Sequence, residues 1–187
     1  MGKTFKILGF AGSLRRESFN KALLRAAVGL VPENVELEVF DLEGIPLFNQ
    51  DLEQEPGERV REFKARIKAS DAILIATPEY NYSIPGVLKN AIDCASRPYG
   101  DNAFEHKPVA IMGAAPGMLG TARAQYHLRQ CFVYLTCFAL NQPEVMVAHA
   151  REKFDKDGRL IDQRTRELIK ELLENLVAWT RRLTPSS

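Results

Sequence analysis

Donors for an anion gather directly after the first apolar run of the chain. Ser13, Arg15, Ser18 and Asn20 all fall within residues 12–20, which we call the phosphate loop. A guanidinium is a permanently charged, forked donor that suits a pair of phosphate oxygens, and hydroxyl and amide groups add neutral donors. A helix expected to begin near Ser18 would point its unpaired N–H groups at the same place. The loop predicts a phosphate site, although Ser18 could also be an ordinary helix N-cap beside solvated arginines.

A second loop, residues 77–85, follows the third apolar run, and we call it the ring loop. The N–H and C=O groups of residues 79–83 suit the polar edge of a flat heteroaromatic ring. Tyr80 and Tyr82 offer flat faces to that ring or to an aromatic substrate. The plainer interpretation is a simple turn, because turns favour these residue types. Together the two loops predict bound flavin mononucleotide (FMN).

The elements that must position these loops alternate along the chain. Each apolar strand pattern is followed by a helical pattern, with no repeat or linker between them. The strands are expected at residues 6–11, 35–39, 71–76, 109–113 and 144–148. The helices are expected at residues 18–30, around 60–67, from 83 onward, at 119–138 and after 162. Asp162 is expected to be the N-cap of the last helix.

This order predicts an α/β three-layer sandwich with a parallel sheet, because each parallel connection needs a crossover. Five strands favour the flavodoxin-like order 2-1-3-4-5, whose ligand-binding switch point lies between strands 1 and 3. Those are the two strands that end in the phosphate and ring loops. A further loop at residues 41–57, rich in Gly, Pro and Asn, is placed to cover one side of a ligand.

Bulk composition narrows the function classes. A chain of 187 residues suits one domain, residues 1–187, and its 25 Lys and Arg nearly balance 24 Asp and Glu, for a net charge of +1. Such a balance gives no basic stripe for nucleic acid. The longest apolar stretch, residues 131–140, is about half a membrane span. We expect a cytoplasmic protein without nucleic-acid or membrane partners.

Metal and nucleophile patterns are missing from the sequence. The three cysteines form no Cys-x-x-Cys unit, and the three histidines have no Cys or His nearby at ligand spacing. No metal site is expected, and the cysteines suit a reducing compartment. Neither the Gly-x-Gly-x-x-Gly motif nor the Walker A motif is present, so dinucleotide or triphosphate binding through them is not expected.

The two loops resemble a known family. The motif Gly-Ser-Leu-Arg-x-x-Ser-x-Asn at residues 12–20 and the motif Pro-Glu-Tyr-Asn-x-Ser-x-Pro-Gly-x-Leu-Lys-Asn-Ala-x-Asp at residues 78–93 are similar to those of the NADPH-dependent FMN reductases. Within that family the bacterial quinone and chromate reductases are most similar. The resemblance extends from residue 6 to about residue 176. It implies FMN as cofactor, with NADPH or NADH as co-substrate, and leaves the choice between the two open.

The resemblance also implies which residues hold FMN. At the phosphate these are Ser13, Arg15, Ser18 and Asn20, and at the ring they are Pro78, Glu79, Tyr80, Asn81 and Tyr82. A third segment, residues 114–121, matches a small-residue loop beside the flavin, with backbone contacts expected from Gly113, Pro116 and Gly117. Many relatives have a serine near Ala115 and a glycine at Thr121, so a hydroxyl contact could be missing here.

With FMN bound, no catalytic side chain is expected, because the cofactor carries the chemistry. The implied activity is ping-pong hydride transfer from a nicotinamide through FMN to quinones, chromate, azo compounds, free flavin or other small acceptors, with Tyr80 and Tyr82 shaping the acceptor site. The alternative is a flavodoxin-like electron carrier, or a flavin-dependent partner protein without NAD(P)H turnover. Carriers dock through surfaces of one sign, and this chain is nearly neutral. A phosphate-binding module without flavin is the third possibility.

The fourth helix bears on assembly. Residues 123–135 are apolar on more than one face, and such a helix must bury both sides. One side would pack on its own sheet and the other on a second subunit, unless the helix lies deep in the core. The resemblance favours a homodimer or homotetramer.

Overall fold

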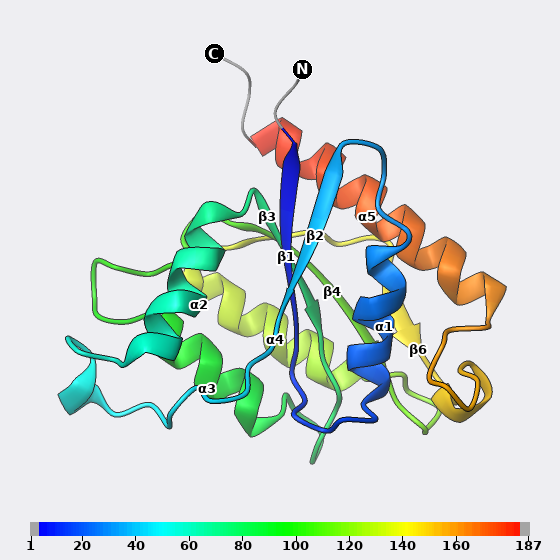
Figure 1. The fold of residues 1–187 in the computed structure, drawn as a ribbon, viewed down its shortest axis with the longest axis horizontal. Coiled ribbons are helices and arrows are strands. Elements are labelled where there is room, and N and C mark those ends of the chain that lie inside the picture. Colours follow the sequence, from blue (N-terminus) through cyan, green and yellow to red (C-terminus); the bar gives the residue numbers. More distant parts are fainter. Residues whose placement is uncertain (1–3, 184–187) are drawn as a thin grey trace.

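The computed structural model describes residues 4–183. Its sheet is parallel, with strand order β2-β1-β3-β4-β5 and β6 paired to β4 (Figure 1). The four main strands are β1 (Phe5–Ala11), β2 (Val35–Phe40), β3 (Ala72–Ala76) and β4 (Pro108–Ala114). The predicted flavodoxin-like order is confirmed, and its switch point lies between β1 and β3.

The fifth sheet position holds two short strands where the sequence pattern predicted one. β5 (Phe138–Ala139) pairs with the start of β4, and β6 (Val145–Val147) pairs with its end. The helix predicted to reach residue 138 ends earlier, because Thr136 turns left-handed at φ 58° and caps α4 (Ala122–Leu135). Residue 138 is therefore in a strand, and the prediction for this boundary was wrong.

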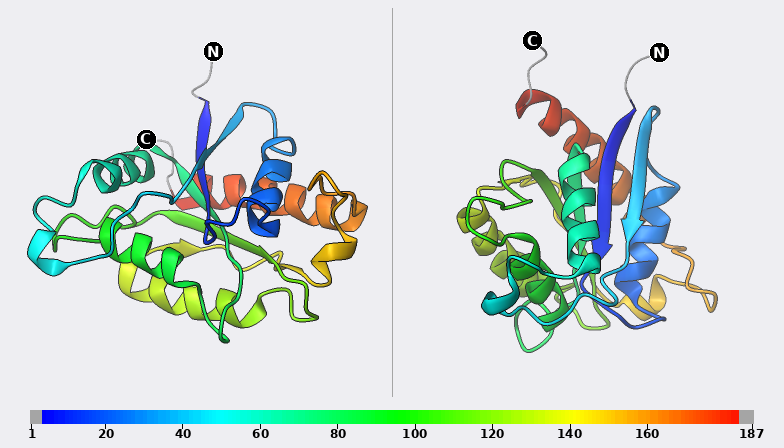
Figure 2. Two further views of the ribbon diagram at one scale, coloured as in Figure 1. Left: turned by 60° about the horizontal axis from the view of Figure 1, so that its bottom comes forward. Right: turned by 60° about the vertical axis from the view of Figure 1, so that its left-hand side comes forward.

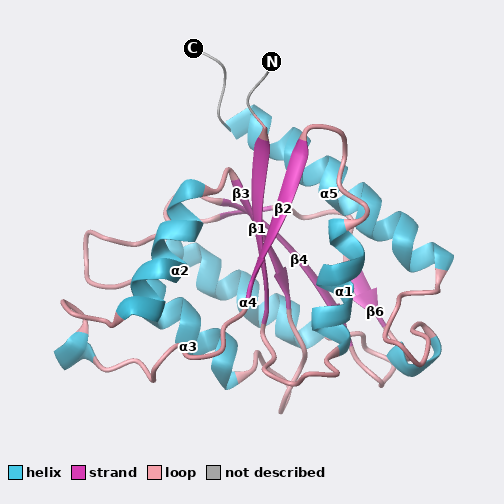
Figure 3. Ribbon diagram, in the orientation of Figure 1, coloured by secondary structure: helices cyan, strands magenta, loops and turns pink. Residues whose placement is uncertain are grey.

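Helices cover both faces of the sheet (Figures 2 and 3). On one face α1 (Phe19–Val28) and α5 (Gln163–Leu183) pack in one apolar cluster. On the other face α2 (Glu58–Ala69), α3 (Gly86–Ala95) and α4 pack in a second cluster. Side chains of β3 alternate between the two clusters, as a strand buried on both faces requires. Two short 3₁₀ helices, η1 (Gln50–Leu52) and η2 (Ala150–Glu152), lie in connections.

Local side chains cap α1 and α5, whereas the residues before α2, α3 and α4 make no side-chain capping bond. Ser18 caps α1, which was the plainer interpretation of that residue, and the Asp162 carboxylate caps α5 as predicted, by accepting the Thr165 N–H at 2.9 Å. The third helix, expected from residue 83, begins at Gly86, with Pro85 at the position before it. Within residues 4–183 the helices are all too short or too polar to cross a membrane.

Candidate functional site

Three loops meet at the carboxyl edge of β1, β3 and β4, at the bottom of Figure 1. They are the phosphate loop, the ring loop and residues 114–121, which we call the small-residue loop. The Gly12 N–H donates to the Ala76 carbonyl at 2.9 Å, and the Thr77 N–H donates to the Met112 carbonyl at 3.0 Å. Parallel pairing of the strands therefore sets these loops side by side.

The phosphate loop offers its donors in a compact space. Ser13 and Ser18 are both buried, and the Ser18 hydroxyl accepts the Lys21 N–H at 3.4 Å. Ser18 is thus an N-cap, yet its own O–H hydrogen still suits a phosphate oxygen, since a hydroxyl both accepts and donates. A Cβ added to Gly12 would lie only 3.0 Å from Pro85, so this loop packs tightly on the start of α3. Two hydroxyls, a helix N-terminus and the exposed Arg15 form a donor set that fits a phosphate monoester.

Asn20 has an additional partner that the sequence did not indicate. Its side chain is buried; its amide donates to the Ala114 carbonyl at 3.0 Å, and its carbonyl accepts the Ala114 N–H at 2.9 Å. The carboxamide therefore joins the phosphate loop to the end of β4. A direct contact between Asn20 and a phosphate stays a prediction.

The ring loop contains a tight, strained turn. Tyr80 and Ser83 exchange both backbone hydrogen bonds, at 3.0 and 2.9 Å. The two residues between them, Asn81 and Tyr82, have φ values of 49° and 67°. A two-residue hairpin turn of this kind needs positive φ twice, which glycine and asparagine adopt easily but tyrosine does not. The turn leaves the ring of Tyr80 half-exposed and that of Tyr82 68% exposed.

Glu79 links the ring loop to α4. Its carboxylate is 8% exposed and accepts the backbone N–H groups of Arg123 and Ala124 at 3.0 and 3.2 Å. It also accepts the Arg123 Nε–H at 2.5 Å and pairs with Nη2. The hydrogen bond that Arg123 donates to Glu79 raises the pKa of the Arg123 guanidinium. That guanidinium lies 3.5 Å from the centre of the Tyr82 ring.

The small-residue loop also contains a strained residue. Thr121 is buried at φ 74°, and its hydroxyl accepts the Gln125 amide at 3.2 Å. A Cβ added to the buried Gly113 would lie 1.9 Å from the Thr121 hydroxyl and 2.6 Å from the Thr77 carbonyl. Only glycine allows β4 to approach the other two segments so closely. At Gly117, by contrast, an added Cβ meets no atom within 4 Å, so the loop backbone is accessible there.

Sequence reasoning missed Arg123 and Gln125 as parts of the site. One signal could have found Arg123. An acid follows strand β3 at Glu79, and an arginine follows strand β4 and its short loop, so the topology brings opposite charges to one sheet edge. The backbone strain at Thr121 leaves no comparable signal in residue types.

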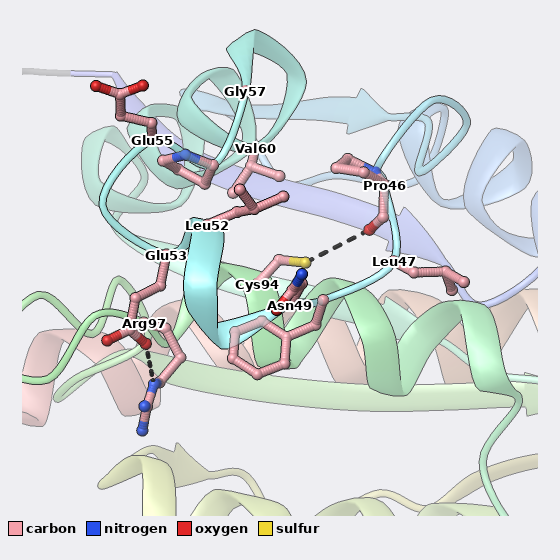
Figure 4. Close-up of a pocket in the computed structure, with 12 residues that line it drawn as sticks. Pro46, Leu47, Asn49, Leu52, Glu53, Glu55, Gly57, Val60, Cys94 and Arg97 are labelled. Carbon is pink, nitrogen blue, oxygen red and sulfur yellow. Dashed lines mark hydrogen bonds and ion pairs between the residues drawn. The ribbon is translucent and has the colours of Figure 1, made fainter.

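The loop at residues 41–57 packs against α3 and encloses a cavity of about 210 Å³ (Figure 4). The Cys94 thiol donates to the Pro46 carbonyl at 3.6 Å, and Arg97 pairs with Glu53 at 2.9 Å. Burial raises the pKa of the Cys94 thiol to about 11. The residues lining this cavity come from outside the phosphate, ring and small-residue loops.

In the part of the chain that the structure describes, no three His, Cys, Asp or Glu side chains are grouped so as to hold a metal ion.

Comparisons with known proteins agree with this geometry. The family model described as NADPH-dependent FMN reductase matches residues 5–152. An NAD(P)H-dependent FMN reductase of Pseudomonas aeruginosa is 53% identical over 186 residues, which cover 98% of this chain and 99% of that protein. A 2-hydroxy-1,4-benzoquinone reductase of a Burkholderia species is 43% identical over 176 residues, covering 94% and 96%. Among solved structures, the flavoenzyme NAD(P)H:(acceptor) oxidoreductase FerB of Paracoccus denitrificans has a TM-score of 0.87 at 34% identity, covering 95% of this chain and 98% of that one.

Proposed function

The chain belongs to the NADPH-dependent FMN reductase family, and we propose that its phosphate, ring and small-residue loops form the FMN site. It is an FMN-dependent NAD(P)H oxidoreductase. When bound, FMN supplies the redox chemistry, which takes a hydride from a nicotinamide and delivers it to a quinone, a free flavin or another small acceptor. The observation that carries the assignment is that the two predicted loops meet at the ends of the adjacent strands β1 and β3.

At the phosphate end, the residues of this chain bind and orient. Ser13 and Ser18 donate hydroxyl hydrogens, Arg15 supplies the forked cation, and the first N–H groups of α1 complete the set. Asn20 holds this end against β4 through Ala114. The donor set suits a dianionic monoester, and FMN carries its phosphate in that form.

At the ring end, residues Pro78 to Tyr82 would hold the polar edge of the flavin. The backbone N–H and C=O of Tyr80 are already hydrogen-bonded to Ser83, so the polar contacts would come from the other residues of this segment. The exposed backbone of Pro116 and Gly117 would be available to the ring, and Gly113 allows the close packing of β4 against Thr77 and Thr121. The exposed rings of Tyr80 and Tyr82 border the space that the nicotinamide and the acceptor occupy in turn.

Use of one space by both substrates makes the reaction ping-pong. Donor and acceptor each need to stack on the same flavin face, and no side chain must move a proton between them. Initial rates measured at several fixed acceptor concentrations should give parallel double-reciprocal lines. Intersecting lines would show that both substrates bind together.

The first test of the function is an absorbance spectrum of the purified, FMN-reconstituted protein before and after anaerobic NADPH or NADH. We expect the oxidised flavin band to be retained on the protein and then to bleach. A bound flavin that neither nucleotide bleaches would indicate an electron carrier. If the protein retains no flavin, the proposed FMN site is wrong.

We also propose that the chain assembles as a homodimer or homotetramer through α4. Its inner face packs on the sheet, whereas Tyr126, Val133 and Tyr134 lie exposed on the outside, the last two by 83% and 76%. An apolar helix face of this kind marks an interface. Light scattering should give a multiple of 21.0 kDa; a monomer mass would contradict the proposal.

Two further proposals concern the whole chain. Residues 1–187 form a single FMN-binding domain, which limited proteolysis should leave as one protected fragment. The protein acts in the cytoplasm, as its three free cysteines favour; recovery in another cell fraction would contradict this.

A further inference from the structure

We propose that Glu79 and Arg123 are positioning residues for the flavin ring, which lock the ring loop onto the first turn of α4. The inference rests on the proposed FMN site, since the ring loop forms one of its walls. Neither side chain needs to touch the flavin in this role.

The first step of the argument is the number of bonds to one carboxylate. Glu79 is 8% exposed and meets four donors, namely the N–H groups of Arg123 and Ala124 and two nitrogens of the guanidinium. A carboxylate at a helix N-terminus is favoured by the N–H groups and by the helix dipole. Thr121, at the N-cap position of α4, makes no such side-chain bond. Glu79 therefore performs the capping from a different loop.

The second step concerns the strained turn. Tyr82 is held at φ 67°, a conformation that a bulky residue keeps only when its surroundings impose it. The residue is largely exposed, and the Arg123 guanidinium carbon lies over its ring, 3.5 Å from the ring centre. One turn further along α4, His127 Nδ1 lies 3.0 Å from the Ser83 hydroxyl. Side chains of α4 thus hold the ring loop from outside at two points.

The third step is that α4 directly continues the small-residue loop. Thr121 ends that loop and is bound to Gln125, and Arg123 lies between them in sequence. A carboxylate from the ring loop on this same turn joins the two loops that border the flavin ring. The phosphate loop has no part in the Glu79–Arg123 pair. Loss of the pair should therefore disturb the ring more than the phosphate.

The test compares Glu79→Ala and Arg123→Lys with the wild-type holoenzyme. Lysine keeps the charge of Arg123 but has neither its fork nor its flat surface. FMN affinity is measured by flavin fluorescence, the ring environment by visible circular dichroism, and kcat and KM with a benzoquinone. For both variants we expect a changed dichroism band and a KM for the quinone raised about tenfold, equivalent to about 1.4 kcal/mol. The FMN Kd should rise less than the KM.

Asp162→Ala is the matched control. Asp162 also caps a helix, through Thr165 of α5 at 2.9 Å, and also pairs with a cation, Lys153 at 2.7 Å. This control should lower the melting temperature and leave dichroism and KM unchanged. If Glu79→Ala and Arg123→Lys behave like Asp162→Ala, Glu79 is only a structural cap and the inference is wrong.

Two safeguards keep the result interpretable. Arg123 is partly exposed, so Arg123→Lys should fold even if Glu79→Ala does not. In that case the dichroism band and the KM of Arg123→Lys alone test the inference. If both have wild-type values, the inference is wrong. A wild-type protein that fails to retain or bleach FMN would instead overturn the proposed function.

Discussion

The phosphate loop and the ring loop are held in place in different ways. In the phosphate loop the two serines are held by local bonds, since Ser13 accepts the Arg15 N–H and Ser18 accepts the Lys21 N–H. In the ring loop the bonds reach across the fold, since Glu79 and Ser83 bind residues 44 positions away on α4. The contrast teaches that a few consecutive residues can supply most of the donors of an anion site. A site for a flat ring needs the tertiary structure to bring its walls together.

The Asn20 side chain joins the phosphate loop to the end of β4 through two buried hydrogen bonds, and its removal should have the largest effect. Asn20→Ala leaves the buried N–H and C=O of Ala114 without their partner. We expect the free energy of unfolding of the apoprotein to fall by about 3 kcal/mol, from two unmade buried hydrogen bonds. Urea denaturation measures this.

Asn175→Ala is the control for that change. The amide of Asn175 makes a longer, exposed bond of 3.4 Å to the Gln142 carbonyl, so its loss should cost less than about 0.5 kcal/mol. Equal costs for the two variants would mean that the phosphate loop is held by local bonds alone, which would sharpen the contrast between the loops.

Arg15→Ala should come next, and its effect should fall on FMN rather than on folding. Arg15 is exposed in the free protein, and a charged hydrogen bond to a phosphate contributes about 1.5–3 kcal/mol. The FMN Kd should rise about 10- to 100-fold, with the melting temperature of the apoprotein unchanged. Arg16→Ala, its exposed neighbour, should leave the Kd near the wild-type value. Fluorescence titration compares them, and equal losses would show only a general effect of charge.

The same contrast explains how much could be predicted from the sequence. The first four strand patterns, the N-cap Asp162 and the phosphate loop all depend on residues a few positions apart, and the strands and the cap were confirmed. The split of the fifth strand position depends on Thr136 turning left-handed, which residue type does not favour. The Glu79 cap of α4 and the Asn20 bond to Ala114 depend on which strands become neighbours. Such contacts follow only once the topology is known.

Thr121→Gly tests whether strain in the small-residue loop is likewise imposed by the fold. Glycine would relieve about 1–2 kcal/mol of left-handed strain. It would also lose the hydroxyl bond to Gln125 and a buried methyl group, and it would make the unfolded chain more flexible. We expect a net loss of about 1 kcal/mol in the free energy of unfolding, with FMN still bound. If the variant is more stable than the wild type, the strain at Thr121 costs more free energy than its hydrogen bond to Gln125 and its packing contribute.

Tyr82→Gly should have the smallest effect on stability and the clearest effect on the reaction. Relief of strain of about 1 kcal/mol is offset by the loss of the Arg123 contact, about 0.5–1 kcal/mol at an exposed site, and by the flexibility of glycine. The melting temperature should therefore stay close to that of the wild type, while KM for an aromatic acceptor rises. Tyr82→Phe keeps the ring and should keep the KM. If instead Tyr82→Gly has a clearly lower melting temperature and an unchanged KM, Tyr82 stabilises the turn and does not shape the acceptor site. The ring loop would then resemble the phosphate loop, whose bonds serve its own fold.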